Sequence, residues 1–130
     1  MTELEFKALA SQGYNRIPLI VETIADLETP LSLYLKLTRQ QAQNSFLLES
    51  VVGGERFGRY SFIGLPARTC LRAFGTKTEI VENGAVTETH EGNPLDFIAA
   101  YQSRFRVAIS PGLPRFCGGL AGYPVPPGIF

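Results

Sequence analysis

Glu49 and Ser50 are the residues whose types and position suggest chemistry most directly, because they interrupt the apolar run Phe46–Val52. A carboxylate buried in such a run without a partner is costly, since burial penalises the charged form. Glu49 therefore requires a cation, which Arg56 or Arg59 could supply. If the strand ends here, a carboxylate, a hydroxyl and unpaired backbone groups meet, which suits a small zwitterion such as an amino acid. A structural salt bridge beside a strand-terminal serine is the alternative interpretation.

Other kinds of site have weaker support. Gly53 and Gly58 have the spacing of a phosphate-binding loop, but Arg59 and Tyr60 stand where that loop needs Lys and then Ser or Thr. The segment that follows is predicted to be a strand, so no helix N-terminus would hold the anion. The chain has one histidine, His90, which we interpret as a surface residue. Its two cysteines fit reduced thiols and do not complete a zinc site, so we predict no metal site.

Composition excludes several classes of protein. The chain has 130 residues, 45% of them hydrophobic and 18% charged, as expected for one globular domain. A formal net charge of zero gives no electrostatic reason to expect a nucleic acid or an anionic membrane as partner. No apolar run is long enough for a transmembrane helix, and acidic residues stand where a secretory signal is basic. We therefore expect a cytoplasmic protein.

Three helices are predicted from their capping signals. Thr2–Glu5 fits a capping box, and Gly13 can end the helix that it starts. Thr29–Pro30 and Asn93–Pro94 each combine a capping residue with proline at the first helical position. The residues expected on the core face of the third helix are Leu95, Ile98 and Ala99.

Strands are predicted where β-branched and aromatic residues cluster between turn signals. Asn83–Gly84 is a strong hairpin signal, so the region around it is expected to form an antiparallel meander. Asn44–Val52 is predicted to be buried on both faces, because its apolar residues are consecutive. The strands expected are Ile17–Ile24, Asn44–Val52, Tyr60–Leu65, Thr69–Phe74, Thr78–Val81, Ala85–Thr89 and Phe116–Tyr123. The sequence therefore predicts an α+β fold, a mostly antiparallel sheet flanked by helices.

Three ordered motifs resemble one enzyme family. They are LLES at Leu47–Ser50, the stretch Gly58–Gly64 and the stretch Cys117–Tyr123. Together they are similar to the N-terminal region of anthranilate synthase component I, a chorismate-utilising enzyme, over about residues 3 to 123. Aminodeoxychorismate synthase component I shares much of the pattern and is an alternative.

The resemblance implies a part of a larger enzyme. The family converts chorismate, with ammonia delivered from glutamine by an amidotransferase subunit, to anthranilate and pyruvate in tryptophan biosynthesis. Its chorismate and Mg²⁺ sites lie in a C-terminal catalytic domain. Residues 1–123 would then be an incomplete N-terminal regulatory domain of a two-domain protein, and residues 124–130 an atypical Pro-rich tail. Such a fragment is expected to have no catalytic residues and no cofactor of its own, and to be inactive alone.

The resemblance also implies a regulatory site for L-tryptophan. The serine of LLES, Ser50, would contact this feedback inhibitor, and Glu49 would shape the pocket. Arg59, Tyr60 and Ser61 would line the same side. The C-terminal domain would complete the pocket. Two other interpretations remain open at this point: a stand-alone amino-acid-binding module with a complete site, and a purely structural or subunit-docking piece.

Overall fold

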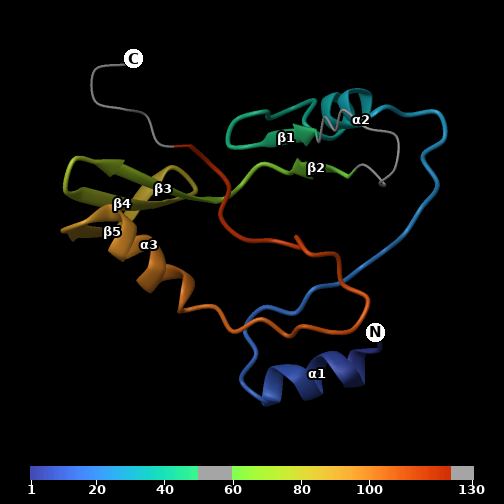
Figure 1. The fold of residues 1–130 in the computed structure, drawn as a ribbon, viewed down its shortest axis with the longest axis horizontal. Coiled ribbons are helices and arrows are strands. Elements are labelled where there is room, and N and C mark those ends of the chain that lie inside the picture. The colour runs from blue at the N-terminus through green and yellow to red at the C-terminus, as the bar shows by residue number, and fades with distance from the viewer. Residues whose placement is uncertain (50–59, 124–130) are drawn as a thin grey trace. The chain divides into compact units, whose positions relative to one another are not determined.

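The computed structural model describes residues 1–49 and 60–123 (Figure 1). These residues belong to two structural units, one formed by Met1–Val21 with Gln102–Phe130 and the other by Glu22–Tyr101. The described residues form three helices and two antiparallel sheets, which confirms the α+β prediction. The elements are α1 (Glu3–Ser11), α2 (Pro30–Leu37), β1 (Phe46–Glu49), β2 (Ser61–Gly64), β3 (Thr69–Phe74), β4 (Lys77–Glu82), β5 (Ala85–Glu91) and α3 (Pro94–Gln102).

The first unit contains α1 and a clasp between two distant segments. The predicted capping box is present, since the amide of Glu5 donates to Thr2 Oγ1 at 3.2 Å and the Thr2 amide donates to the Glu5 carboxylate at 2.6 Å. In the clasp, Asn15 Nδ2 donates to the Arg104 carbonyl, and the Arg106 amide donates to Asn15 Oδ1, both at 2.7 Å. The Asn15 side chain therefore joins the two segments by two hydrogen bonds, beside backbone bonds such as that from the Asn15 amide to the Arg106 carbonyl at 3.0 Å.

Two predicted strands do not form. Ile17–Ile24 is irregular, and its neighbour Arg16 makes a single bridge with Val107. β-Branched residues favour a strand, but a strand also needs a partner to hydrogen-bond with, which this segment does not find among the described residues. Phe116–Tyr123 is also irregular, because Gly118 and Gly119 have φ angles of 146° and 145°, which glycine adopts readily and other residues do not.

In the second unit, α2 covers the β1–β2 hairpin (Figure 1). The Tyr34 hydroxyl of α2 lies 2.8 Å from Ser45 Oγ, directly before β1. The expectation that this strand is buried on both faces was wrong. Leu48 is 52% exposed, because only two strands pair here and α2 covers one face.

A glycine fixes the register of this hairpin. Phe46 pairs with Gly64, and Glu49 pairs with Ser61 at the other end of the ladder. A Cβ placed on Gly64 would fall within the ring of Phe46, so the aromatic ring occupies the space that a side chain at residue 64 would need. The Phe46–Gly64 contact therefore determines which residues face each other across the hairpin.

The meander was predicted correctly, and α3 packs beside it. β3, β4 and β5 form an antiparallel sheet with Asn83–Gly84 at the β4–β5 turn, where φ is 50° and 84°. His90 is exposed, as expected, but its ring also stacks on Phe97 of α3 with centroids 4.9 Å apart. The expected core face of α3 was wrong: Phe97 is 4% exposed and Leu95 is 73% exposed. The aromatic contact with the sheet, rather than the aliphatic stripe, orients the helix.

Replacing Gly64 by alanine should destabilise the hairpin. The new methyl group must displace the Phe46 ring, and forcing extra carbon into a filled space costs about 1–3 kcal/mol. We expect a loss of this size in the free energy of unfolding, measured by urea titration. Gly122→Ala is the matched control, because nothing lies within 4 Å of a Cβ there. Equal stability of the two variants would contradict the role given to Phe46.

Candidate functional site

The hairpin brings together part of the predicted site. Glu49 ends β1, Ser61 begins β2, and their Cα atoms are cross-strand partners. Tyr60 directly precedes β2 and is exposed, with its ring stacked on Phe62 at 6.5 Å. Ser50 and Arg59, the other two predicted residues, lie outside the described residues, so their roles stay predictions. Three of the five predicted residues are therefore gathered at one end of the hairpin.

Glu49 is not the buried charge that the sequence led us to expect. Glu49 is exposed, and its carboxylate makes no ion pair with any residue in the part of the chain that the structure describes. The expectation failed because β1 belongs to a two-stranded sheet, which does not enclose the end of the strand. The carboxylate is thus solvated and available to a ligand without the desolvation cost that a core position would impose.

Ser61 and Ile63 line a hollow between β2 and the start of α2. Its volume is about 200 Å³, and we call it the Ser61 hollow. Its lining residues are Ala25, Glu28, Thr29, Pro30, Leu33, Ser61 and Ile63. Ligand pockets usually measure about 300–1,000 Å³, so a hollow of this size suits one group of a small molecule. Its walls are mostly apolar, with polar groups from Glu28, Thr29 and Ser61.

Glu49 shares a face of the hairpin with this hollow. Successive side chains of a strand point to opposite faces, so Ser61 and Ile63 point to the same one. Residues paired across an antiparallel ladder also share a face, which places Glu49 beside Ser61 on the side of α2. A carboxylate, a hydroxyl and a mostly apolar hollow therefore lie on one side of the β1–β2 hairpin.

A larger hollow of about 330 Å³ lies at the other end of α2. Its lining residues are Lys36, Leu37, Arg39, Gln40, Gln41 and Pro66. All the α2 residues among them are exposed, and none of the predicted site residues reaches it. We therefore follow the Ser61 hollow as the candidate site.

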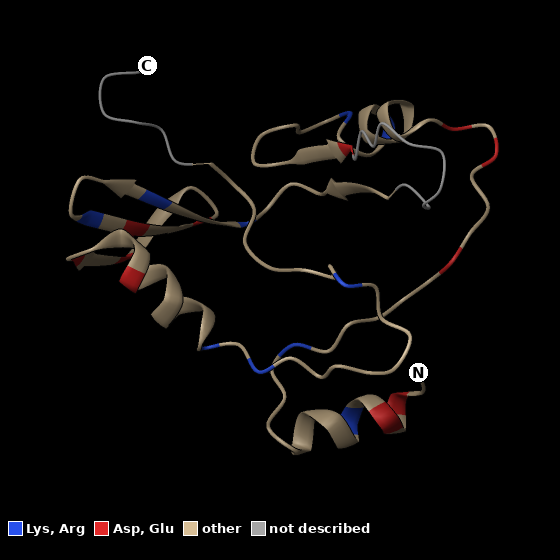
Figure 2. Cartoon of the chain, in the orientation of Figure 1, with Lys and Arg blue, Asp and Glu red and all other residues tan. Residues whose placement is uncertain are grey.

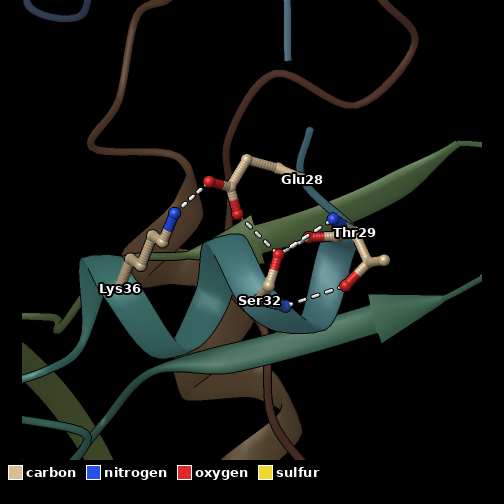
Figure 3. Close-up of polar contacts among 4 residues, drawn as sticks. All are labelled: Glu28, Thr29, Ser32 and Lys36. Carbon is tan, nitrogen blue, oxygen red and sulfur yellow. Dashed lines mark hydrogen bonds and ion pairs between the residues drawn. The ribbon is translucent and has the colours of Figure 1, made fainter. Parts of the chain in front are cut away.

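The start of α2 is held by a polar cluster that the sequence analysis missed (Figure 3). Thr29 caps the helix as predicted: the Ser32 amide donates to Thr29 Oγ1 at 3.0 Å, and the Thr29 amide donates to Ser32 Oγ at 2.9 Å. The Ser32 hydroxyl also donates to Glu28 Oε2 at 2.6 Å, and Lys36 Nζ forms an ion pair with Glu28 Oε1. We call these four residues the Glu28 cluster.

The spacing of the Glu28 cluster was readable in the sequence. Glu28, Ser32 and Lys36 follow each other at intervals of four, which places side chains on one side of a helix and its entry. Figure 2 shows acidic residues along the segment that leads into α2 and basic residues on α2 and after it. The ammonium group of Lys36, and next the hydroxyl of Ser32, hold the pKa of Glu28 below its ordinary value of 4.5. Glu28 therefore presents an ionised carboxylate to the hollow at neutral pH.

Within residues 1–49 and 60–123, no group of three or more His, Cys, Asp or Glu side chains could hold a metal ion. Cys70 and Cys117 are free thiols, as predicted. None of the helices in these ranges has both the length and the apolar character needed to cross a membrane.

Curated proteins provide close relatives of the chain. It is 57% identical over 123 residues to anthranilate synthase component 1 of Neisseria meningitidis serogroup B, a match that covers 95% of this chain and 25% of that protein. It is 55% identical over 124 residues to the protein of the same name from Pseudomonas putida. The Synechocystis relative is 47% identical over 117 residues. No family model and no solved structure matches the chain.

These relatives confirm the resemblance that the three motifs predicted, to the N-terminal region of anthranilate synthase component I. The chain spans about a quarter of their length, as expected of a partial domain. The names favour neither alternative, the aminodeoxychorismate synthase or the stand-alone binding module. A match of sequence assigns no role to a side chain, so the five site residues remain predictions.

Acid should weaken the Glu28 cluster. Because the folded-state pKa of Glu28 lies below 4.5, the ionised carboxylate stabilises the folded chain fully above pH 4.5. This contribution is lost as the pH falls through the lowered pKa. We expect the free energy of unfolding to fall less steeply below pH 4.5 in Glu28→Gln than in the parent chain, in urea titrations at a series of pH values. The difference should be small, since solvated ion pairs contribute little.

Glu22→Gln is the control for this experiment. Glu22 is an exposed acid on the same segment, and it makes no ion pair with a described residue. This control should keep the pH dependence of the parent chain. Parallel curves for the parent and Glu28→Gln would show that the cluster does not stabilise the fold.

Proposed function

We propose that this chain, a relative of anthranilate synthase component 1 over 95% of its length, forms one side of a tryptophan feedback site in an anthranilate synthase. The observation that carries the proposal is the pairing of Glu49 with Ser61 beside the Ser61 hollow. A free amino acid has an ammonium group, a carboxylate and a side chain. The Glu49 carboxylate suits the ammonium group, and the mostly apolar hollow suits the side chain.

The rest of the pocket would come from polypeptide outside this sequence. The relatives are about four times as long as their match with this chain, and the Ser61 hollow is smaller than a typical ligand pocket. Two apolar residues adjacent in sequence to its lining residues also lack cover: Leu27 is 99% exposed and Ile24 is 83% exposed. A C-terminal catalytic domain packed here would enclose both the effector and these side chains.

The same C-terminal domain would explain why two predicted strands do not form in this chain. Ile17–Ile24 and Phe116–Tyr123 have strand-like sequences but no ladder among the described residues. Strands of an incomplete domain gain their partners only when the remaining chain supplies them. We therefore propose that residues 1–123 are one part of a regulatory domain, followed by the Pro-rich segment 124–130, whose structure lies outside the described residues.

In this proposal the chemistry belongs to the rest of the enzyme. Chorismate and Mg²⁺ would bind in the catalytic domain, and a glutamine amidotransferase subunit would supply ammonia for the synthesis of anthranilate and pyruvate. This region would contribute no catalytic residue and act in the cytoplasm as part of tryptophan biosynthesis. Its own residues would bind tryptophan, the end product, so that inhibition depends on the tryptophan concentration.

Inhibition then follows from linkage between the two sites. Tryptophan inhibits if it binds the inactive arrangement of the two domains more tightly than the active one. The ratio of the two affinities sets the coupling free energy, which is typically 1–3 kcal/mol. Residues at the interface of the domains are suited to this task, because a change in domain arrangement alters the pocket directly.

Ser50→Ala should weaken inhibition by tryptophan about tenfold in the full-length enzyme that contains this region. The substitution removes a hydroxyl that is predicted to contact the effector, and tenfold corresponds to a hydrogen bond worth about 1–1.5 kcal/mol. The measurement is anthranilate formation against tryptophan concentration. Ser110→Ala is the control, because this exposed serine lies in the other structural unit. Unchanged inhibition in Ser50→Ala would support the purely structural interpretation instead.

A further inference from the structure

Glu28 is the one charged side chain that lines the Ser61 hollow, within the described residues. Its carboxylate is held at both oxygens, by Lys36 at Oε1 and by the Ser32 hydroxyl at Oε2 (Figure 3). The two partners come from one helix, α2, so the carboxylate is oriented before any ligand arrives. A group that is already ordered loses little conformational entropy when it makes a further contact.

The carboxylate retains capacity to accept another hydrogen bond. An ionised carboxylate has about four acceptor positions on its two oxygens, of which Lys36 and Ser32 occupy two. Thr29, which also lines the hollow, already uses its side-chain oxygen to cap the helix, since Thr29 Oγ1 accepts a hydrogen bond from the Ser32 amide. Glu28 is therefore the strongest hydrogen-bond acceptor among the residues that line this hollow.

We propose that the Glu28 carboxylate accepts the indole N–H of the bound effector and so selects tryptophan over amino acids whose side chain has no N–H donor. This inference rests on the proposed feedback site and names its specificity. Indole is a large apolar ring with one N–H, which can donate but not accept. Such a side chain matches a hollow with apolar walls from Ala25, Leu33 and Ile63 and one charged acceptor.

The charge of the acceptor matters for discrimination. A hydrogen bond to an ionised group is roughly twice as strong as one between neutral groups. A ring of the same shape without the N–H would fill the hollow equally well but would not make this additional hydrogen bond to the carboxylate. Lys36 forms an ion pair with Glu28, but the carboxylate would stay ionised at neutral pH without it, because its ordinary pKa of 4.5 is already far below 7.

The test compares two effectors of nearly the same shape in the full-length enzyme that contains this region. One is L-tryptophan, and the other is its analogue with sulfur in place of the indole N–H. The readout is the ratio of the two concentrations that give half-inhibition. We expect the parent enzyme to prefer tryptophan about tenfold or more, as the loss of a hydrogen bond to a charged group implies. In Glu28→Gln the preference should fall at least about threefold, because the acceptor becomes neutral.

Lys36→Met is the matched variant. It removes the ion pair but keeps the Glu28 carboxylate, so the preference for tryptophan should persist even if both effectors bind more weakly. A merely structural role for the Glu28 cluster would weaken both effectors together in both variants and leave the ratio unchanged. That result, with tryptophan still inhibiting the parent, would overturn the inference and leave the proposed function standing. Failure of tryptophan to inhibit the parent enzyme at all would overturn both.

Discussion

The Phe46 ring lying over Gly64 is the contact on which the geometry of the β1–β2 hairpin depends. It sets the register of the ladder, and the register places Glu49 opposite Ser61. Because side chains alternate along a strand, a slip by one residue would turn the shifted strand's side chains to the other face. The absence of a side chain at residue 64 therefore determines where the polar end of the hairpin lies.

The start of α2 contributes the other wall of the candidate binding surface beside this polar end of the hairpin. The Glu28 cluster ties the residue before the helix to its first two turns, and the Ser61 hollow lies between this helix start and β2. Its apolar walls and ionised rim suit the side chain of an aromatic amino acid. The hollow is open, and Leu27 and Ile24, which flank its lining residues along the chain, are largely exposed. In our proposal a second domain covers this surface, so effector binding and domain arrangement depend on each other.

Local chemistry made much of this fold predictable from sequence. The capping box at Thr2, the Thr29–Pro30 helix start and the Asn83–Gly84 turn each depend on residues a few positions apart, and each was predicted correctly. Ile17–Ile24 was predicted wrongly because strand formation depends on a distant partner. The burial expected for Glu49 failed for the same reason, since it depends on how many strands join the sheet. Glu28 was missed because its four-residue spacing to Ser32 spans the helix boundary.

The central claim is that this region supplies only one side of a tryptophan site. The most direct measurement is calorimetry with L-tryptophan on two samples, this 130-residue chain and the full-length enzyme that contains it. The account predicts heat of binding from the full-length enzyme and none from the shorter chain at the same concentrations. Micromolar binding by the 130-residue chain alone would contradict it, because a complete site would then be present in this region.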